Sequence, residues 1–138
     1  MRRVKTLLLG SRNNLPPLVE AMREKGIFLD VTAEEYLGVV DHLARYTPEV
    51  AQAVRTITAE DHELDLVILH NSAGQGVSKA ECINIRMRDK TLVAWGGNYS
   101  PSEERPYREM GFQNFFQYFF LRSKILEMFP IEKDARKV

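Results

Sequence analysis

Several features that assign proteins to a class are scarce in this chain of 138 residues. It has a single cysteine, Cys82, which cannot form a disulfide within the chain, so we expect the protein to work in the reducing cytoplasm. Its apolar runs are only a handful of residues long, too short to cross a membrane. Met1-Arg2-Arg3 precedes a short aliphatic run without a small-residue cleavage site, which predicts a first strand rather than a signal peptide.

Net charge is also lacking. The 19 lysines and arginines are matched by 19 acidic residues, so the formal net charge is +0. This balance argues against a nucleic-acid binder and against a polybasic protein of the membrane surface. The 3 histidines are scattered without the spacing of metal ligands, and the glycines match neither GxGxxG nor the Walker pattern. We therefore expect no nucleic acid, membrane, metal or cofactor as a partner.

What the chain does contain is a regular alternation of strand-like and helix-like patterns. Short aliphatic or aromatic runs occupy residues 4–9, 27–31, 64–70, 91–95 and 112–116. Six helical patterns lie between or after these runs. Two cover residues 47–57 and 118–128, one follows Pro16, and three begin at Thr32, Ser78 and Ser100. This order predicts βαβ units, and so a five-stranded parallel sheet inside a three-layer α/β sandwich. Residues 1–130 are expected to form one domain and residues 131–138 a charged tail.

Local signals indicate where several helices begin and end. Gly26 is expected to end the first helix in a left-handed conformation. Ser78 with Glu81 forms a capping-box pattern that predicts a helix start at Ser78. Pro106 is expected to shorten, kink or restart the helix that begins near Ser100.

Polar loops follow the first, third and fourth strands of the predicted sheet. Ligands of open parallel sheets bind beyond the carboxyl ends of the strands. We therefore expect these loops to converge into a small polar pocket for a small molecule or nucleotide, with Arg12 as counter-charge to an anion at a helix N-terminus. As an alternative function, the pocket indicates a ligand-binding protein or an enzyme. The candidate pocket residues are Ser11, Arg12, Asn13, His70, Asn71, Ser72, Gly96 and Asn98.

No complete catalytic constellation accompanies this pocket. His70 has the titration range of a general base or phosphoryl acceptor, but no orienting carboxylate stands close to it in sequence, and a hydrogen-bonded strand-end histidine is the simpler interpretation. Ser72 lacks one of the two glycines of a nucleophile elbow. Cys82 lies in a helical pattern, where packing is the expected role. We therefore expect a protein that is not an enzyme.

Three stretches carry a family resemblance. In Asp65 to His70 an acidic residue leads aliphatic residues to a strand end, and Gly74-Gln75-Gly76 follows at the place of a Pro-Gly-x-x-Gly pattern. Gly111 to Phe120 is similar to a Gly-Ala-Asp-Asp-Tyr-Leu-x-Lys-Pro-Phe signature. With the order of elements, these stretches resemble the receiver domain of two-component response regulators, which implies a flavodoxin-like fold. Residues 41–63 exceed the family's second helix and loop and are expected to add a helix.

The residues that carry receiver chemistry are replaced in this chain. The resemblance places His70 at the position of the phosphorylated aspartate, and Gly10 and Ser11 where two acids would hold magnesium. Tyr118 stands at the position of the family's lysine. The resemblance therefore implies a degenerate receiver, or pseudo-receiver, that acts in signal transduction as a phosphorylation-independent regulatory module.

Aromatic residues are concentrated near the C-terminal end of the predicted domain. A helix that begins near Tyr118 cannot bury all of these rings on one stripe, so some are expected at the surface as an interface for a protein partner or a second copy. In receivers this face serves dimerisation, so the resemblance implies a homodimer. In the alternative, residues 47–57 cover the rings. The interface candidates are Phe116, Tyr118, Phe119 and Phe120.

Overall fold

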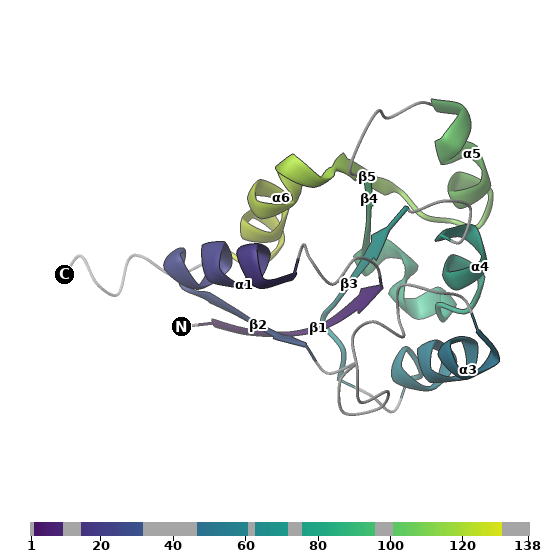
Figure 1. The fold of residues 1–138 in the computed structure, drawn as a ribbon, viewed down its shortest axis with the longest axis horizontal. Coiled ribbons are helices and arrows are strands. Elements are labelled where there is room, and N and C mark those ends of the chain that lie inside the picture. The colour runs from purple at the N-terminus through teal and green to yellow at the C-terminus, as the bar shows by residue number, and fades with distance from the viewer. Residues whose placement is uncertain are drawn as a thin grey trace.

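The computed structural model describes residues 2–9, 15–31, 47–60, 63–71, 76–95 and 101–130. Its centre is a sheet of five parallel strands in the order β2-β1-β3-β4-β5 (Figure 1). This order is that of the flavodoxin-like α/β fold, so the fold class expected from the sequence is confirmed. The strands are β1 (Arg2–Leu9), β2 (Ile27–Val31), β3 (Leu66–His70), β4 (Thr91–Trp95) and β5 (Asn114–Gln117).

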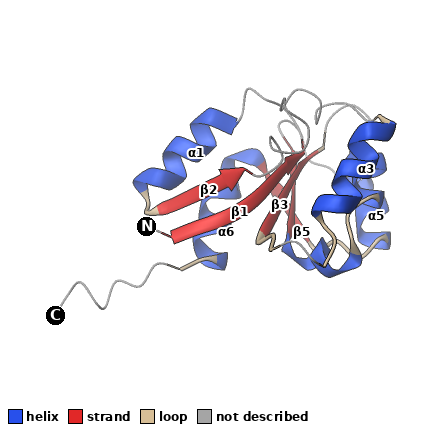
Figure 2. Cartoon of the chain, turned by 90° about the horizontal axis from the view of Figure 1, so that it is seen from below, coloured by secondary structure: helices blue, strands red, loops and turns tan. Residues whose placement is uncertain are grey.

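Helices cover both faces of the sheet (Figures 1 and 2). On one face lie α1 (Leu15–Glu24) and α6 (Leu121–Met128). On the other face lie α3 (Pro48–Ile57), α4 (Gly76–Glu81) and α5 (Pro101–Glu109). Two 3₁₀ helices, η3 (Ile85–Lys90) and η4 (Tyr118–Phe120), lead into β4 and α6. Each face therefore has its own hydrophobic core, and no helix within the described residues is long and apolar enough to cross a membrane.

The central strand β3 is apolar at nearly every position because it faces a core on each side. Val67 and Leu69 pack toward the layer of α3, α4 and α5. Leu66 and Ile68 pack toward α1 and α6. All four side chains have an exposed fraction of 0%, as expected for a strand that runs through the middle of a parallel sheet.

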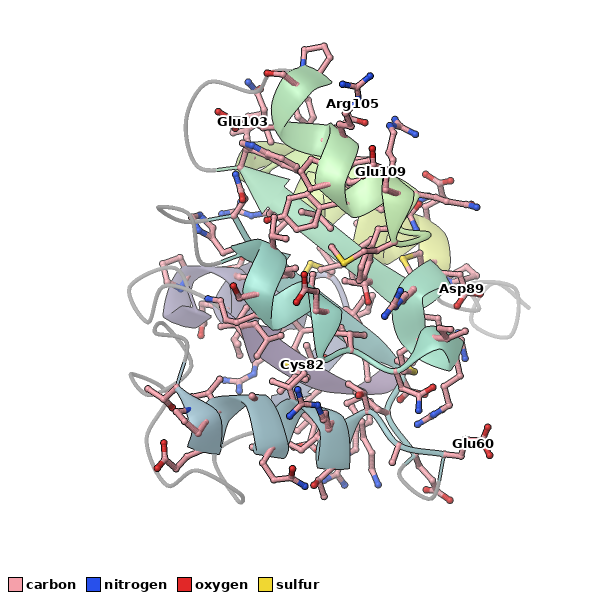
Figure 3. All side chains as sticks on the ribbon, turned by 90° about the vertical axis from the view of Figure 1, so that its right-hand side faces the viewer. Glu60, Cys82, Asp89, Glu103, Arg105 and Glu109 are labelled. Atoms are coloured by element: carbon pink, nitrogen blue, oxygen red, sulfur yellow. The ribbon has the colours of Figure 1, made fainter. Side chains whose placement is uncertain are left out.

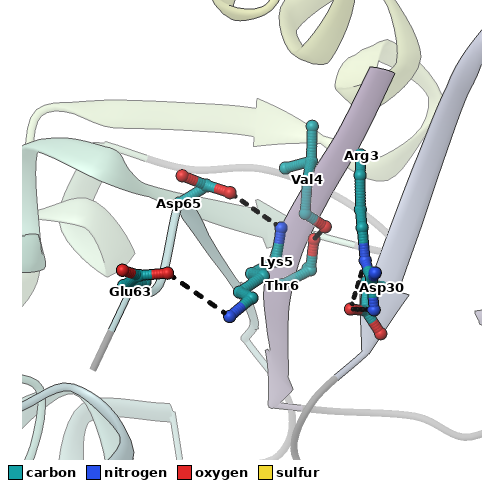
Figure 4. A network of polar contacts seen from close by, with 7 residues as sticks. All are labelled: Arg3, Val4, Lys5, Thr6, Asp30, Glu63 and Asp65. Atoms are coloured by element: carbon teal, nitrogen blue, oxygen red, sulfur yellow. Dashed lines mark hydrogen bonds and ion pairs between the residues drawn. The ribbon is translucent and has the colours of Figure 1, made fainter. Parts of the chain in front are cut away.

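Polar contacts hold β1 to its two neighbours, β2 and β3 (Figure 4). Asp65 pairs with the main chain of Lys5 twice: its N–H donates to Lys5 O at 2.9 Å, and its Oδ2 accepts from Lys5 N at 2.9 Å. Arg3 forms an ion pair with Asp30 on the other side of β1. Asp65 therefore aligns β1 with β3, and it lies at the opposite end of β3 from His70.

Two of the expected helix boundaries are confirmed. Thr47 Oγ1 accepts a hydrogen bond from Val50 N at 3.1 Å, and Pro48 opens the first turn of α3. Gly26 adopts a φ of 90° just after α1, in the left-handed region that glycine occupies without strain. The helix predicted from Thr32 lies outside the described residues.

Other boundaries predicted from the sequence are wrong. Helix α4 begins at Gly76, so Ser78 lies inside the helix rather than capping it. Strand β5 begins at Asn114, because Phe112 turns into the core before the strand starts. The last helical segment opens as η4 and becomes α-helical only at Leu121. Helix α5 is one continuous helix that contains Pro106, so a restart at this proline, one of the three expected effects, does not occur. The first three differences lie at the ends of elements whose existence the sequence predicts, where boundaries are least sharply defined.

Candidate functional site

The carboxyl ends of β3 and β4 meet α4 and α5 at one edge of the sheet. His70 is the last residue of β3, and the N–H of Asn71 donates to Ala94 O at 2.7 Å, which extends the pairing of β3 with β4. The structure thus brings two of the predicted pocket residues to the expected edge. The remaining six, Ser11, Arg12, Asn13, Ser72, Gly96 and Asn98, lie outside the described residues.

A buried tyrosine that the sequence analysis missed links this edge to α5. Tyr107 is fully buried, and its hydroxyl donates to Oδ1 of Asn71. Burial and the nearby carboxylate of Glu103 raise the pKa of Tyr107, so the hydroxyl keeps its proton at neutral pH. A Cβ at Gly76 would overlap the tyrosine oxygen and lie 2.9 Å from Asn71 Oδ1. Glycine at position 76 is therefore what allows α4 to approach this hydrogen bond.

Trp95 connects the end of β4 to the same group. Its ring meets Tyr107 edge-on at 5.8 Å and Phe115 at 6.0 Å between centroids. Its Nε1–H donates to Oε2 of Glu103, which lies near the start of α5 (Figure 3). The tryptophan therefore attaches α5 to the sheet by ring packing and a charge-assisted hydrogen bond.

Two basic side chains come together beside this group. Lys79 on α4 has an exposed fraction of 0%, and burial lowers the pKa of its amine. Burial, and secondly the charge of Lys79, lower the pKa of His70. Lys79 was not among the predicted site residues, because lysine is rarely fully buried and its place in a helical pattern alone does not indicate burial. The described part of this edge thus holds two largely buried basic residues, and their lowered pKa values favour the neutral forms over the charged ones.

The pKa of His70 predicts how stability depends on pH. Because that pKa lies below its usual value of 6.5, the unfolded chain binds the proton more readily, and stability falls as pH drops below 6.5. The loss continues to the folded-state pKa, at less than about 1.4 kcal/mol per pH unit. Urea unfolding at pH 7.5 and pH 5.5 should show a smaller pH effect in His70→Gln than in wild type. Equal pH effects in the two proteins would show that His70 titrates alike when folded and unfolded.

Cys82 follows α4 directly and is buried in the core between α4 and α3 (Figure 3). Its Sγ lies 3.5 Å from Ser78 O. The packing role expected for it agrees with this position. Within the described residues no group of three or more histidine, cysteine, aspartate or glutamate side chains is placed to hold a metal ion.

A second candidate site lies at the edge strand β5. Phe119 is 83% exposed and Phe120 is 51% exposed, with their rings edge-to-face at 5.3 Å. Beside them is a hollow of about 320 Å³. The hollow is lined by Phe115, Phe116, Gln117 and Phe120. We call these four residues and Phe119 the aromatic edge.

Helix α3 does not cover the aromatic edge. It packs with α4 and α5 against one face of the sheet, and both Phe119 and Phe120 remain exposed. The alternative in which residues 47–57 bury these rings is therefore wrong. The structure places Phe116 and Phe120 together at the hollow, and the side chain of Tyr118 lies outside what it describes.

Cations flank the aromatic edge on both faces of the sheet. The Arg108 guanidinium of α5 lies 4.7 Å from the centre of the Phe115 ring, and the Lys124 amine of α6 lies 5.8 Å from that of Phe116. Each cation also has a carboxylate partner, Glu104 for Arg108 and Glu127 for Lys124. The charges beside the rings are therefore balanced within the chain.

The fold and the two candidate sites define a flavodoxin-like α/β domain with a basic strand-end edge and an exposed aromatic edge. No family model, no curated protein sequence and no solved structure matches the chain. Its function must therefore be argued from the sites, since this fold serves many unrelated functions.

Proposed function

We propose that this protein is a phosphorylation-independent interaction module, resembling a receiver domain, that works as a homodimer in the cytoplasm. The observation that carries the proposal is the aromatic edge, where an almost fully exposed Phe119 stands beside a hollow lined by three phenylalanines and Gln117. Burying apolar surface yields about 25 cal/mol per Å², so a partner that covers both rings gains binding free energy. Exposed aromatic clusters of this kind mark protein interfaces.

The occupant that fits the aromatic edge best is a second copy of the chain. A projecting ring and a hollow lie on the same surface, so a two-fold axis can seat the Phe119 of each copy against the hollow of the other. The cations nearby are paired with carboxylates of their own chain, which limits repulsion between copies. These features support a self-complementary interface.

The basic strand-end edge supports independence from phosphorylation. Aspartyl phosphorylation requires a carboxylate nucleophile and a magnesium ion held by acidic oxygens. Here His70 ends β3 and Lys79 lies close enough to affect its pKa. Neither of these side chains offers the carboxylate oxygen that this chemistry needs. A regulatory role without phosphoryl transfer, and without catalysis, is consistent with that chemistry.

Light scattering coupled to size-exclusion chromatography tests the proposal. We expect a wild-type dimer and a folded Phe119→Glu monomer, because a carboxylate at the centre of an apolar interface loses its hydration. Ile85→Glu is the matched control, since Ile85 is 78% exposed on η3 and lies outside the aromatic edge. This control should remain dimeric. A monomeric wild type at all concentrations, or a Phe119→Glu dimer of unchanged affinity, would refute the proposed interface.

A second candidate function is binding of an anionic small molecule or nucleotide at the strand-end edge. The meeting of His70 and Lys79 where flavodoxin-like folds bind ligands favours it. This second function would replace the first if two results are found together. The wild-type protein would be a monomer, and inorganic phosphate would raise the melting temperature of wild type but not that of His70→Gln.

A further inference from the structure

We infer that the two copies join edge to edge through their β5 strands, so that the two sheets become one continuous sheet. The inference rests on the proposed homodimer and adds to it the main-chain contacts that would hold it. Among the described residues, β5 pairs only with β4, so one side of the strand has no neighbouring strand. The hollow of the aromatic edge lies beside this strand, where an added strand would run.

The hydrogen-bond register shows which groups of β5 face outward. Asn71 N–H donates to Ala94 O, so Ala94 turns its main-chain groups toward β3. Successive residues of a strand turn these groups to alternate sides, so Val93 turns toward β5. Val93 lies opposite Phe115. In a parallel pair, a residue that faces the partner strand bonds to the two residues on either side of the one opposite, and the opposite residue turns its own N–H and C=O groups away. Phe115 and Gln117 therefore direct their N–H and C=O groups out of the sheet.

Strand β5 also carries neither of two residue types that commonly protect an edge, a charged residue or a proline. The other edge strand, β2, carries Asp30, which forms an ion pair with Arg3. Of the two edges, β5 is thus the one that admits another strand.

A second β5 strand fits this edge in antiparallel orientation around a two-fold axis. With Phe116 on the axis, Phe115 of one copy lies opposite Gln117 of the other, and each such pair exchanges both of its N–H···O=C bonds. The two Phe116 residues form the non-hydrogen-bonded pair between them, where opposed side chains come closest. The pairing thus uses both outward residues and covers the hollow beside them. A foreign extended peptide could use the same groups, and the oligomeric state separates that outcome from this one.

Amide hydrogen exchange by NMR tests strand pairing separately from dimerisation. In wild-type dimer the amides of Phe115 and Gln117 should exchange at least about tenfold more slowly than in the monomeric Phe119→Glu variant. The amide of Phe116 points to β4 and should change much less, so it serves as an internal control. A wild-type dimer in which Phe115 and Gln117 exchange as in the monomer would overturn strand pairing while leaving the homodimer intact. A wild-type monomer would overturn both.

Gln117→Pro provides a second test, with Gln117→Ala as the control. Proline removes an outward amide hydrogen and leaves the hydrogen bonds between β4 and β5 in place, as edge strands tolerate. We expect Gln117→Pro to be a folded monomer and Gln117→Ala a dimer. A Gln117→Pro dimer of unchanged affinity would contradict the inference. If the proline variant fails to fold, the exchange measurement on wild type and Phe119→Glu still shows whether the β5 strands pair.

Discussion

Trp95→Ala is expected to lower the free energy of unfolding by about 3–5 kcal/mol, the range for deleting a large buried aromatic side chain. Trp95 is 3% exposed and contacts the rings of Tyr107 and Phe115. Its loss leaves a cavity at the point where β4 and α5 meet, and it leaves Glu103 without the indole donor. Because Trp95 is the only tryptophan, urea unfolding of both proteins should be followed by circular dichroism.

Trp95→Phe is the control for this prediction. Phenylalanine retains an aromatic ring against Tyr107 but removes the donor to Glu103, so we expect a smaller loss than for alanine. If Trp95→Ala costs less than about 1 kcal/mol, the ring does not carry the attachment of α5 to the sheet. If the free energy of unfolding falls equally in the two variants, the hydrogen bond to Glu103 contributes more to stability than the packing of the ring does.

Gly76→Ala is expected to lower the free energy of unfolding by about 1–3 kcal/mol, the usual cost of overpacking a core. Helix propensity alone predicts the opposite sign, since alanine in a helix is favoured over glycine by about 1 kcal/mol. The steric term should exceed it because the added methyl overlaps the hydroxyl of Tyr107, which sits on a rigid and fully buried ring. Urea unfolding of wild type and Gly76→Ala measures which effect is larger.

A double-mutant cycle identifies the cause of that loss. Tyr107→Phe removes the overlapping hydroxyl and, alone, should cost about 1–3 kcal/mol because Asn71 Oδ1 loses its donor. Gly76→Ala should then cost less in the Tyr107→Phe background than in wild type. Gly111→Ala is the control: its φ of 97° makes alanine strained, yet no atom lies within 4 Å of the added Cβ. Its cost should be the same in both backgrounds.

The sequence by itself determined most of the framework. Runs of branched aliphatic residues predict the strands because a parallel sheet covered on both faces requires apolar side chains at every position. The five predicted strands, the helices between them within the described residues and the boundaries of α3 agree with the structure, because periodicity and capping are local properties. The exposure of aromatic rings near the C-terminal end was also predictable, since one short helix cannot bury adjacent phenylalanines on one stripe.

Only the tertiary structure decided which residues meet at the sites. The need for glycine at position 76 comes chiefly from Tyr107, which is distant in sequence, so no local signal reveals it. Lys79 becomes a neighbour of His70 only when α4 packs beside the end of β3. The aromatic edge likewise forms at the rim of the sheet because β5 is the last strand in the strand order. Pattern and propensity act over a few residues, whereas strand order and side-chain contacts arise from packing of the whole chain.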